Sequence, residues 1–206
     1  APAPRPATSS TPTTTPAGPA EAPPATLPDG SSAPVVAIFD VDTITLAGAV
    51  PSQAAADRLT ALAVANSKTP AAVIDLITID PTVPAGVGIR VVELNSSRFP
   101  AGSAEVLPAH ATELDRMATV MNALPNVTVL VIGHADQVGS EENNFAISEQ
   151  RAQAVVHYLV GQGIDASRLS SRAVGESDLL SVADDETSLA LNRRTEFIVY
   201  GALIEA

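Results

Sequence analysis

The 206-residue chain has no cysteine and no tryptophan, and aromatic side chains make up only 3% of it. The absence of cysteine excludes disulfides, thiol catalysis and cysteine-ligated metal sites, and it is compatible with an exported protein. Apolar residues still account for 46% of the chain. The sequence therefore predicts a core built mainly from Val, Leu and Ile.

Positive charge is also scarce: 11 Lys and Arg stand against 23 Asp and Glu, which gives a formal net charge of −12. No basic run occurs, and nucleic-acid binding requires clustered Lys and Arg, so a nucleic-acid partner is excluded. No apolar run approaches the roughly 20 residues that span a bilayer. Because the chain starts at Ala1, we expect that an upstream signal or membrane anchor has been removed.

Proline is unevenly distributed, since residues 1–34 hold 10 of the 17 prolines, with Ala, Thr and Ser filling most of the rest. Such a segment cannot bury enough apolar surface to offset its ordering entropy, and proline keeps it extended. We predict a disordered linker over residues 1–34. A proline-rich ligand for an SH3-type domain is the alternative.

Residues 35–80 have the pattern of two strands, a helix and a strand. The run "VVAIFDVDTITLAGAV" is rich in β-branched residues, Ser52 can cap a helix over "QAAADRLTALAVA", and "AAVIDLITID" returns to strand character. About 45 residues are marginal for independent stability, so this ββαβ unit is expected to contact other parts of the protein.

The same stretch resembles a BON module, whose "v-x-L-x-G-x-V" strand is followed directly by a helix, here "TITLAGAVPSQAAADRLTALA". The first helix of that module is missing. The resemblance implies contact with a membrane or with other envelope components. Because the stretch has no catalytic groups and no basic face, we favour a structural role for it.

Residues 81–87 read as a linker, and residues 88–206 alternate between strand and helix patterns. Strands are predicted in "GIRVVEL", "VTVLVIG", "RLSSRAVG" and "RTEFIVYG", and a helix is predicted over Leu107–Leu124. A second helix is expected to start at Ser148 and to end at Gly161 or Gly163, with a core face of Ala152, Val155, Val156, Leu159 and Val160. The acidic connection "ADDETSLALN" is partly helical in this prediction. The fold class is α/β (α+β), a βαβαβ sandwich with helices on a mixed sheet.

Asp136 and Arg151 are the candidate binding residues. Asp136 follows the predicted strand, and Arg151 lies in the first turn of the predicted helix, so both are expected at one rim of the sheet. Free N–H groups at a helix start and a planar guanidinium suit a carboxylate, and Asp136 suits an ammonium group. Together they describe a receptor for the zwitterionic end of an amino acid. The alternative is that the two side chains bond each other or the neighbouring backbone.

The stretch "GHADQVGSEENNFAISEQRAQAV" resembles the signature of OmpA-like peptidoglycan-binding domains, roughly G-H-[TA]-D-x-x-G-x4-N-x2-L-S-x2-R-A-x-x-V, with Ile147 in place of the usual Leu. The flanking segments "FPAGSAEVLP", "GIDASRLSSRAVGE" and "NRRTEFIV" resemble further family segments. The resemblance covers about residues 88–200. It implies a noncovalent binder of the peptidoglycan stem peptide.

In the family that the chain resembles, the aspartate and the helix arginine grip the free α-amino and α-carboxylate groups of diaminopimelate. The resemblance carries these roles to Asp136 and Arg151. It also implies that the pocket is shaped or supported by Phe99, His134, Asn144 and Ile147, and that Arg193 lies close to the ligand, while Arg194 has a structural role. Pro100 departs from the pattern, because many members have an Asp there.

No catalytic or metal site is predicted. His110, His134 and His157 show no metal-ligand spacing, and His134 reads as a framework residue. The run Asp184, Asp185 and Glu186 lacks the alternation of a calcium loop and reads as a solvated loop. No nucleophile–base pair or hydrolytic carboxylate pair can be identified, which argues against an enzyme that acts on the cell wall. No cofactor is expected.

The leading hypothesis is a wall-anchoring protein of the cell envelope (periplasm, outer membrane or cell wall), with peptidoglycan as its partner. The alternative is an envelope structural or interaction module whose wall-binding site is degenerate or serves another partner. Membrane or envelope-protein contact is assigned to residues 35–80, and the oligomeric state stays open.

Overall fold

The computed structural model describes residues 35–40, 43–66, 73–84, 88–93 and 99–202. The predicted linker over residues 1–34 lies outside these residues. The strands are β1 (Val35–Phe39), β2 (Ile44–Val50), β3 (Val73–Ile79), β4 (Ile89–Glu93), β5 (Thr128–Gly133), β6 (Leu169–Ala173) and β7 (Thr195–Tyr200). The helices are α1 (Gln53–Asn66), α2 (Pro108–Ala123), α3 (Glu141–Gly161) and α4 (Glu186–Asn192), with one 3₁₀ turn, Ala166–Arg168.

All these strands belong to one mixed sheet in the order β3-β2-β1-β4-β7-β5-β6. Strands β1 and β4, β2 and β3, and β5 and β6 pair in parallel, whereas β7 runs antiparallel between β4 and β5. The mixed α/β class that the sequence predicts is therefore confirmed.

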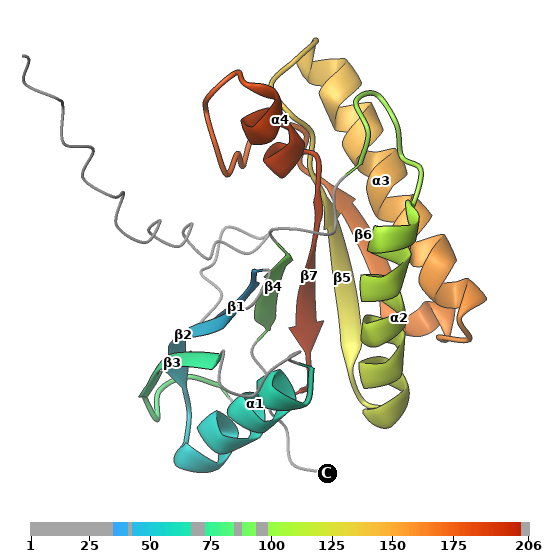
Figure 1. The fold of residues 1–206 in the computed structure, drawn as a ribbon. Helices are drawn as coiled ribbons and strands as arrows, with labels where there is room; N and C mark the ends of the chain where they lie inside the picture. The colour runs from blue at the N-terminus through green and yellow to red at the C-terminus, as the bar shows by residue number, and fades with distance from the viewer. Residues whose placement is uncertain (1–34, 41–42, 67–72, 85–87, 94–98, 203–206) are drawn as a thin grey trace, which may run out of the picture.

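Three helices cover one face of this sheet, α1 over β2 and β3, and α3 over β5 and β6, with α2 beside α3 (Figure 1). An apolar cluster lies under them and combines Leu46 and Leu59 with Leu114, Val155 and Phe197. The predicted helical face of α3 supplies Ala152, Val155 and Leu159 to this core, whereas Val160 is 39% exposed and is not a core residue.

Residues 35–80 form the predicted ββαβ order, and they continue the same sheet. β1 pairs in parallel with β4 from Val35 opposite Ile89 to Phe39 opposite Glu93. The expected contact with the rest of the protein is therefore a shared sheet and a shared core. The division into separate domains at residues 81–87 stays a prediction.

The start of α3 differs from the sequence prediction. The helix begins at Glu141, and Ser140 caps it by accepting a hydrogen bond from the N–H of Asn143, so the prediction of a start at Ser148 is wrong. Glu141 and Glu142 lie in the first turn, where acidic side chains favour a helix because they face its positive end. The hydroxyl of Ser148 instead donates to Phe145 O and accepts from Gly175 N.

The close approach of α3 to β5 requires a glycine. A Cβ at Gly133 would lie 1.9 Å from the carbonyl oxygen of Ser148, which leaves no room for any side chain. This contact fixes the height of α3 above the strand and so positions the residues that follow Ser148.

Among the described residues, the helices are too short or too polar to cross a membrane.

Candidate functional site

The candidate site lies where β5 ends and β7 begins, between α3, α4 and the segment that follows Phe99; this is the upper end of the sheet in Figure 1. Asp136 comes three residues after β5, and Arg193 is the C-cap residue of α4, two residues before β7. Arg151 lies about three turns into α3 rather than in its first turn. The free N–H groups of the helix start therefore do not lie beside Arg151, and that part of the prediction is wrong.

Arg151 is buried, with 1% of its surface exposed, and its guanidinium donates to three backbone carbonyls. Nε reaches Ser103 O at 3.0 Å, Nη1 reaches His134 O at 2.9 Å and Nη2 reaches Pro100 O at 3.2 Å. Burial lowers the pKa of Arg151 to about 10, an effect that the negative charge of Asp136 opposes. Arg151 thus remains a cation at neutral pH, and it ties the loop around Pro100 to the end of β5.

Asp136 pairs with Arg193 rather than with the helix arginine. Nη1 of Arg193 donates to Oδ2 of Asp136 at 3.0 Å, and the other carboxylate oxygen accepts the N–H of Val138 at 3.1 Å. Arg193 also donates through Nε to Phe99 O at 3.0 Å and through Nη2 to the carboxylate of Glu186. Burial alone lowers the pKa of Arg193, but the bonds with Asp136 and Glu186 outweigh it and raise the pKa overall.

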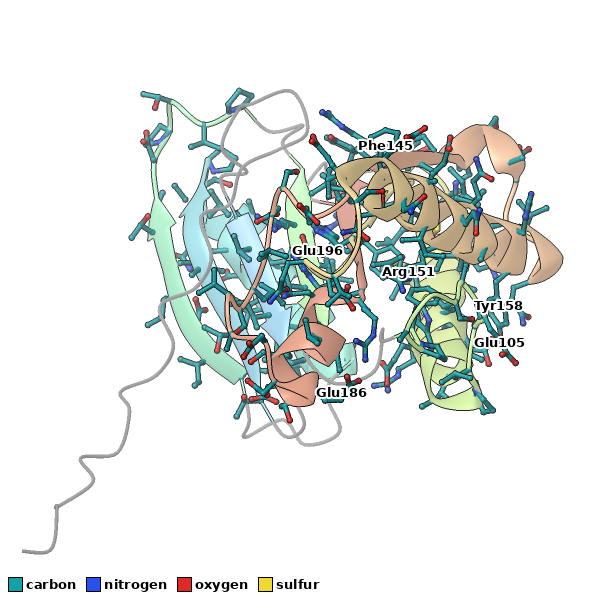
Figure 2. The ribbon with its side chains drawn as sticks, turned by 90° about the horizontal axis from the view of Figure 1, so that it is seen from above. Glu105, Phe145, Arg151, Tyr158, Glu186 and Glu196 are labelled. Atoms are coloured by element: carbon teal, nitrogen blue, oxygen red, sulfur yellow. The ribbon has the colours of Figure 1, made fainter. Side chains whose placement is uncertain are left out.

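The partners of Arg193 differ sharply in exposure. The side chain of Asp136 is 12% exposed and that of Glu186 is 76% exposed, while Arg193 itself is 5% exposed. Figure 2 shows Glu186 on α4 at the periphery of the molecule and Arg151 on α3. The Arg193 guanidinium therefore joins the interior of the site to its solvent-facing rim.

Phe99 contacts both arginines, Arg151 through its ring and Arg193 through its backbone carbonyl. Its ring lies 5.3 Å from the guanidinium carbon of Arg151, within range of a cation–π interaction. The ring of His110 contacts it edge-on at 4.9 Å between centroids. Burial lowers the pKa of His110 to about 4, so this imidazole is neutral at pH 7. The prediction that Phe99 lies near the site agrees with this geometry, whereas His110 was not predicted.

The remaining predicted residues lie directly after β5, as His134 does, or on α3, as Asn144 and Ile147 do. The backbone of His134 accepts from Arg151 and donates to Arg194 O, and burial lowers the pKa of its imidazole to about 3. Asn144 is buried and donates to Glu176, and Ile147 is half-buried on α3. His157 is exposed, as predicted.

A second group of charges lies beside His134, and all of its members except Asp178 are buried. Glu196 bonds Arg90 at 2.6 Å and Arg194 at 2.6 Å, and Arg90 also bonds Asp178 at 2.7 Å. Although burial raises the pKa of Glu196, the positive charge of Arg194 and its other neighbours lowers it to about 2. His134, Asp178 and Glu196 have ligand atoms within 4.8 Å of one another. Two guanidinium groups already balance the carboxylates there, so the group fits an ion-pair network better than a metal site.

Sequence reasoning missed Asn192, which is fully buried next to Arg193. Its side chain accepts from the N–H groups of Leu180 and Ser181 and donates to Gln137 Oε1, next to Asp136. Asn192 thereby holds the segment before α4 against the site. The "NRR" triplet that it opens was the available signal.

Comparison with known proteins adds to this geometry. The OmpA family matches residues 98–193, which include Asp136, Arg151 and Arg193. Residues 98–193 are an OmpA-family domain. Its strands β5 and β6 pair in parallel and end at the edge of the sheet where the candidate site lies.

Relatives of the OmpA-family domain include envelope proteins. The chain is 35% identical over 102 residues to the probable lipoprotein YiaD of Escherichia coli, which covers 50% of this chain and 47% of that protein. It is 41% identical over 81 residues to the peptidoglycan-associated lipoprotein of Haemophilus influenzae, covering 39% and 53%. The chain spans about half the length of these curated relatives.

Among solved structures, the peptidoglycan-associated lipoprotein from Burkholderia pseudomallei aligns with a TM-score of 0.48 at 27% identity, over 50% of this chain and 87% of that one.

Proposed function

We propose that this protein binds peptidoglycan noncovalently through the diaminopimelate of the stem peptide and so anchors itself in the cell envelope. In this proposal Asp136 holds the free ammonium group of diaminopimelate. The adjacent arginines, Arg193 and Arg151, face its carboxyl group. Phe99 and Ile147 provide apolar contact for the methylene chain between the two ends of the ligand.

The observation that supports the proposal most directly is a buried acid between buried guanidinium groups at one rim of the sheet. Asp136 bonds Arg193 at 3.0 Å, and its charge also acts on Arg151. Preorganised opposite charges in a largely desolvated place favour a ligand that holds an ammonium group close to a hydrogen-bond-accepting carboxyl group. The ammonium and carboxyl groups on one carbon atom meet that requirement.

The relatives support the same assignment. Several of them are named peptidoglycan-associated lipoproteins, and others are named outer membrane protein A. Their names speak for attachment to the wall and for a cell-envelope location. The assignment of diaminopimelate rests on the residues of the rim.

A second candidate function is an envelope interaction module without wall binding, and one observation favours it. Three backbone carbonyls occupy all three guanidinium nitrogens of Arg151. That pattern is also what a framework arginine needs. The two functions differ in whether Asp136 meets a ligand, and this can be measured.

The test is retention on insoluble diaminopimelate-type peptidoglycan, comparing the wild type with Asp136→Asn. The substitution keeps the shape of the side chain and removes its charge. Loss of a buried charged contact typically costs about 2 to 5 kcal/mol, so the dissociation constant is expected to rise at least tenfold. Arg151→Gln is less informative, because it removes hydrogen bonds to three backbone carbonyls and weakens the fold.

Asp57→Asn provides the matched control, since Asp57 is an exposed acid on α1 that bonds Gln53. It changes the net charge equally and is expected to leave retention unchanged. Thermal melts establish that each variant is folded. Equal retention of the wild type and Asp136→Asn would refute a ligand role for Asp136 and leave the interaction module as the better reading.

A further inference from the structure

The guanidinium of Arg193, which the proposed ligand would meet, already bonds the carboxylate of Glu186. Arg193 donates through Nη2 to Glu186, whose side chain is 76% exposed, while Arg151 is 1% exposed and bonds only backbone oxygens through the contacts described above. A ligand group that approaches from solvent therefore reaches the Arg193–Glu186 pair first.

A free carboxylate is poorly suited to that position. To bond Nη2 of Arg193 it must displace Glu186 or lie directly beside it, where two negative charges in hydrogen-bonding range of one donor repel each other. Arg151 adds a positive charge nearby, but it is buried and its three guanidinium nitrogens already bond backbone carbonyls. The exposed Asp184 and Asp185, which precede Glu186 in sequence, add negative charge. Arg193 is in addition shared with Asp136.

A carboxamide suits the same pair without displacing anything. Its carbonyl oxygen accepts from a guanidinium N–H, and its NH₂ group donates to the carboxylate of Glu186. The neighbouring ammonium group still meets Asp136. The ligand end then carries one positive charge. This charge suits a site where the acids Asp136, Glu186, Asp184 and Asp185 outnumber the two arginines, in a chain with a formal net charge of −12.

We propose that Glu186 is a specificity residue, which makes this site select diaminopimelate whose free-end carboxyl group is amidated over diaminopimelate with a free carboxylate. The inference rests on the proposed function, because it concerns the chemistry of the ligand in that same site. It assigns a role to a residue that lies on α4, outside the strand and helix that carry Asp136 and Arg151.

The experiment is calorimetric titration of the full chain with two synthetic tripeptides, L-Ala-γ-D-Glu-diaminopimelate with the free end as carboxylate and the same peptide with that carboxyl group as carboxamide. The wild type is expected to bind the carboxamide about tenfold more tightly, which corresponds to about 1.4 kcal/mol. Glu186→Gln removes the charge and keeps the size of the side chain, and it is expected to abolish or reverse this preference by improving binding of the carboxylate.

Asp184→Asn is the matched control. It removes an exposed acid two residues before Glu186, with the same change in net charge, and it is expected to keep the preference of the wild type. If the carboxamide preference disappears equally in Asp184→Asn, the effect comes from net charge and the role of Glu186 is refuted.

Three other results overturn the inference. Equal or tighter binding of the carboxylate by the wild type contradicts the selectivity, although the proposed function stands. A carboxamide preference that survives in Glu186→Gln contradicts the role of this residue. Binding of neither tripeptide, with no wall retention, removes the proposed function and the inference together.

Discussion

At the scale of single residues, the site is held by side chains that bond backbone far away in sequence. Arg151 joins Pro100 and Ser103 to His134, and Arg193 joins Phe99 to Asp136. Both guanidinium groups bond backbone carbonyls in a buried place, where a carbonyl without any hydrogen bond costs free energy. The same residues therefore carry the fold and the candidate chemistry.

His110 gives a pH dependence at this scale. Its folded pKa of about 4 lies below the usual value near 6.5, so the unfolded chain binds a proton that the folded protein does not. Its contribution is complete above about pH 6.5 and is lost as the pH falls toward 4, at up to about 1.4 kcal/mol per pH unit. We expect His110→Gln to flatten the pH dependence of the free energy of unfolding by about that amount.

Urea titrations between pH 6.5 and 4.5 measure this slope, and the window excludes Glu196, whose pKa of about 2 makes its contribution disappear only at lower pH. His134 remains in the variant, so part of the slope persists. His157→Gln, at an exposed position on α3, is the control and should keep the slope of the wild type. An unchanged slope in His110→Gln would contradict the buried neutral state of this imidazole.

The pairing of individual side chains in the site could only partly be predicted from sequence. The "G-H-A-D" and "R-A" anchors mark Asp136 and Arg151 as a pair that shares a rim, and both indeed lie there. The spacing does not predict that Asp136 bonds Arg193, because these residues are 57 positions apart and meet only when β5 and β7 pair. Spacing along one strand and one helix carries no information about that crossing.

At the scale of elements, the strands and helices followed from periodicity, and the boundaries did not. Two Glu and two Asn after Gly139 and Ser140 read as a polar loop, yet Ser140 is a cap and the acids favour the first turn. The helix therefore gained seven residues at its start. Arg151 therefore lies far from the free N–H groups of the helix start, and its guanidinium bonds the carbonyls of the loop around Pro100 instead.

Gly133 provides the prediction at this scale. Because a Cβ there would lie 1.9 Å from a backbone carbonyl of α3, Gly133→Ala must push the helix off β5. We expect a loss of at least about 1 to 3 kcal/mol in the free energy of unfolding, and weaker ligand binding, since Arg151 moves with the helix. Urea denaturation and wall retention measure the two effects.

Gly161→Ala is the matched control, because Gly161 ends the same helix and nothing lies within 4 Å of an added Cβ. It should leave the stability unchanged or raise it by up to about 1 kcal/mol. Similar stability for both alanine variants would mean that α3 can shift without cost and that the glycine does not set its height.

At the scale of the whole molecule, residues 35–80 share a sheet and a core with the part of the chain that follows them. β1 pairs with β4 along five residues, and an apolar cavity of about 110 Å³ at the junction is lined by Leu46 and Leu59 on one side and by Met117 and Phe197 on the other. A continuous sheet over a common core favours a single cooperative unit.

Leu46 tests this cooperativity, since it is fully buried on β2 and lines the junction. Leu46→Ala is expected to lower the free energy of unfolding by about 2 to 5 kcal/mol. If the chain unfolds as one unit, native-state hydrogen exchange should show that loss equally in β2 and in β5, on the far side of the sheet. Leu76→Ala, which truncates a side chain that is 59% exposed on β3, should change either strand by no more than about 0.5 kcal/mol. A loss confined to β2 would instead make residues 35–80 a module that opens by itself, and wall binding would then be independent of it.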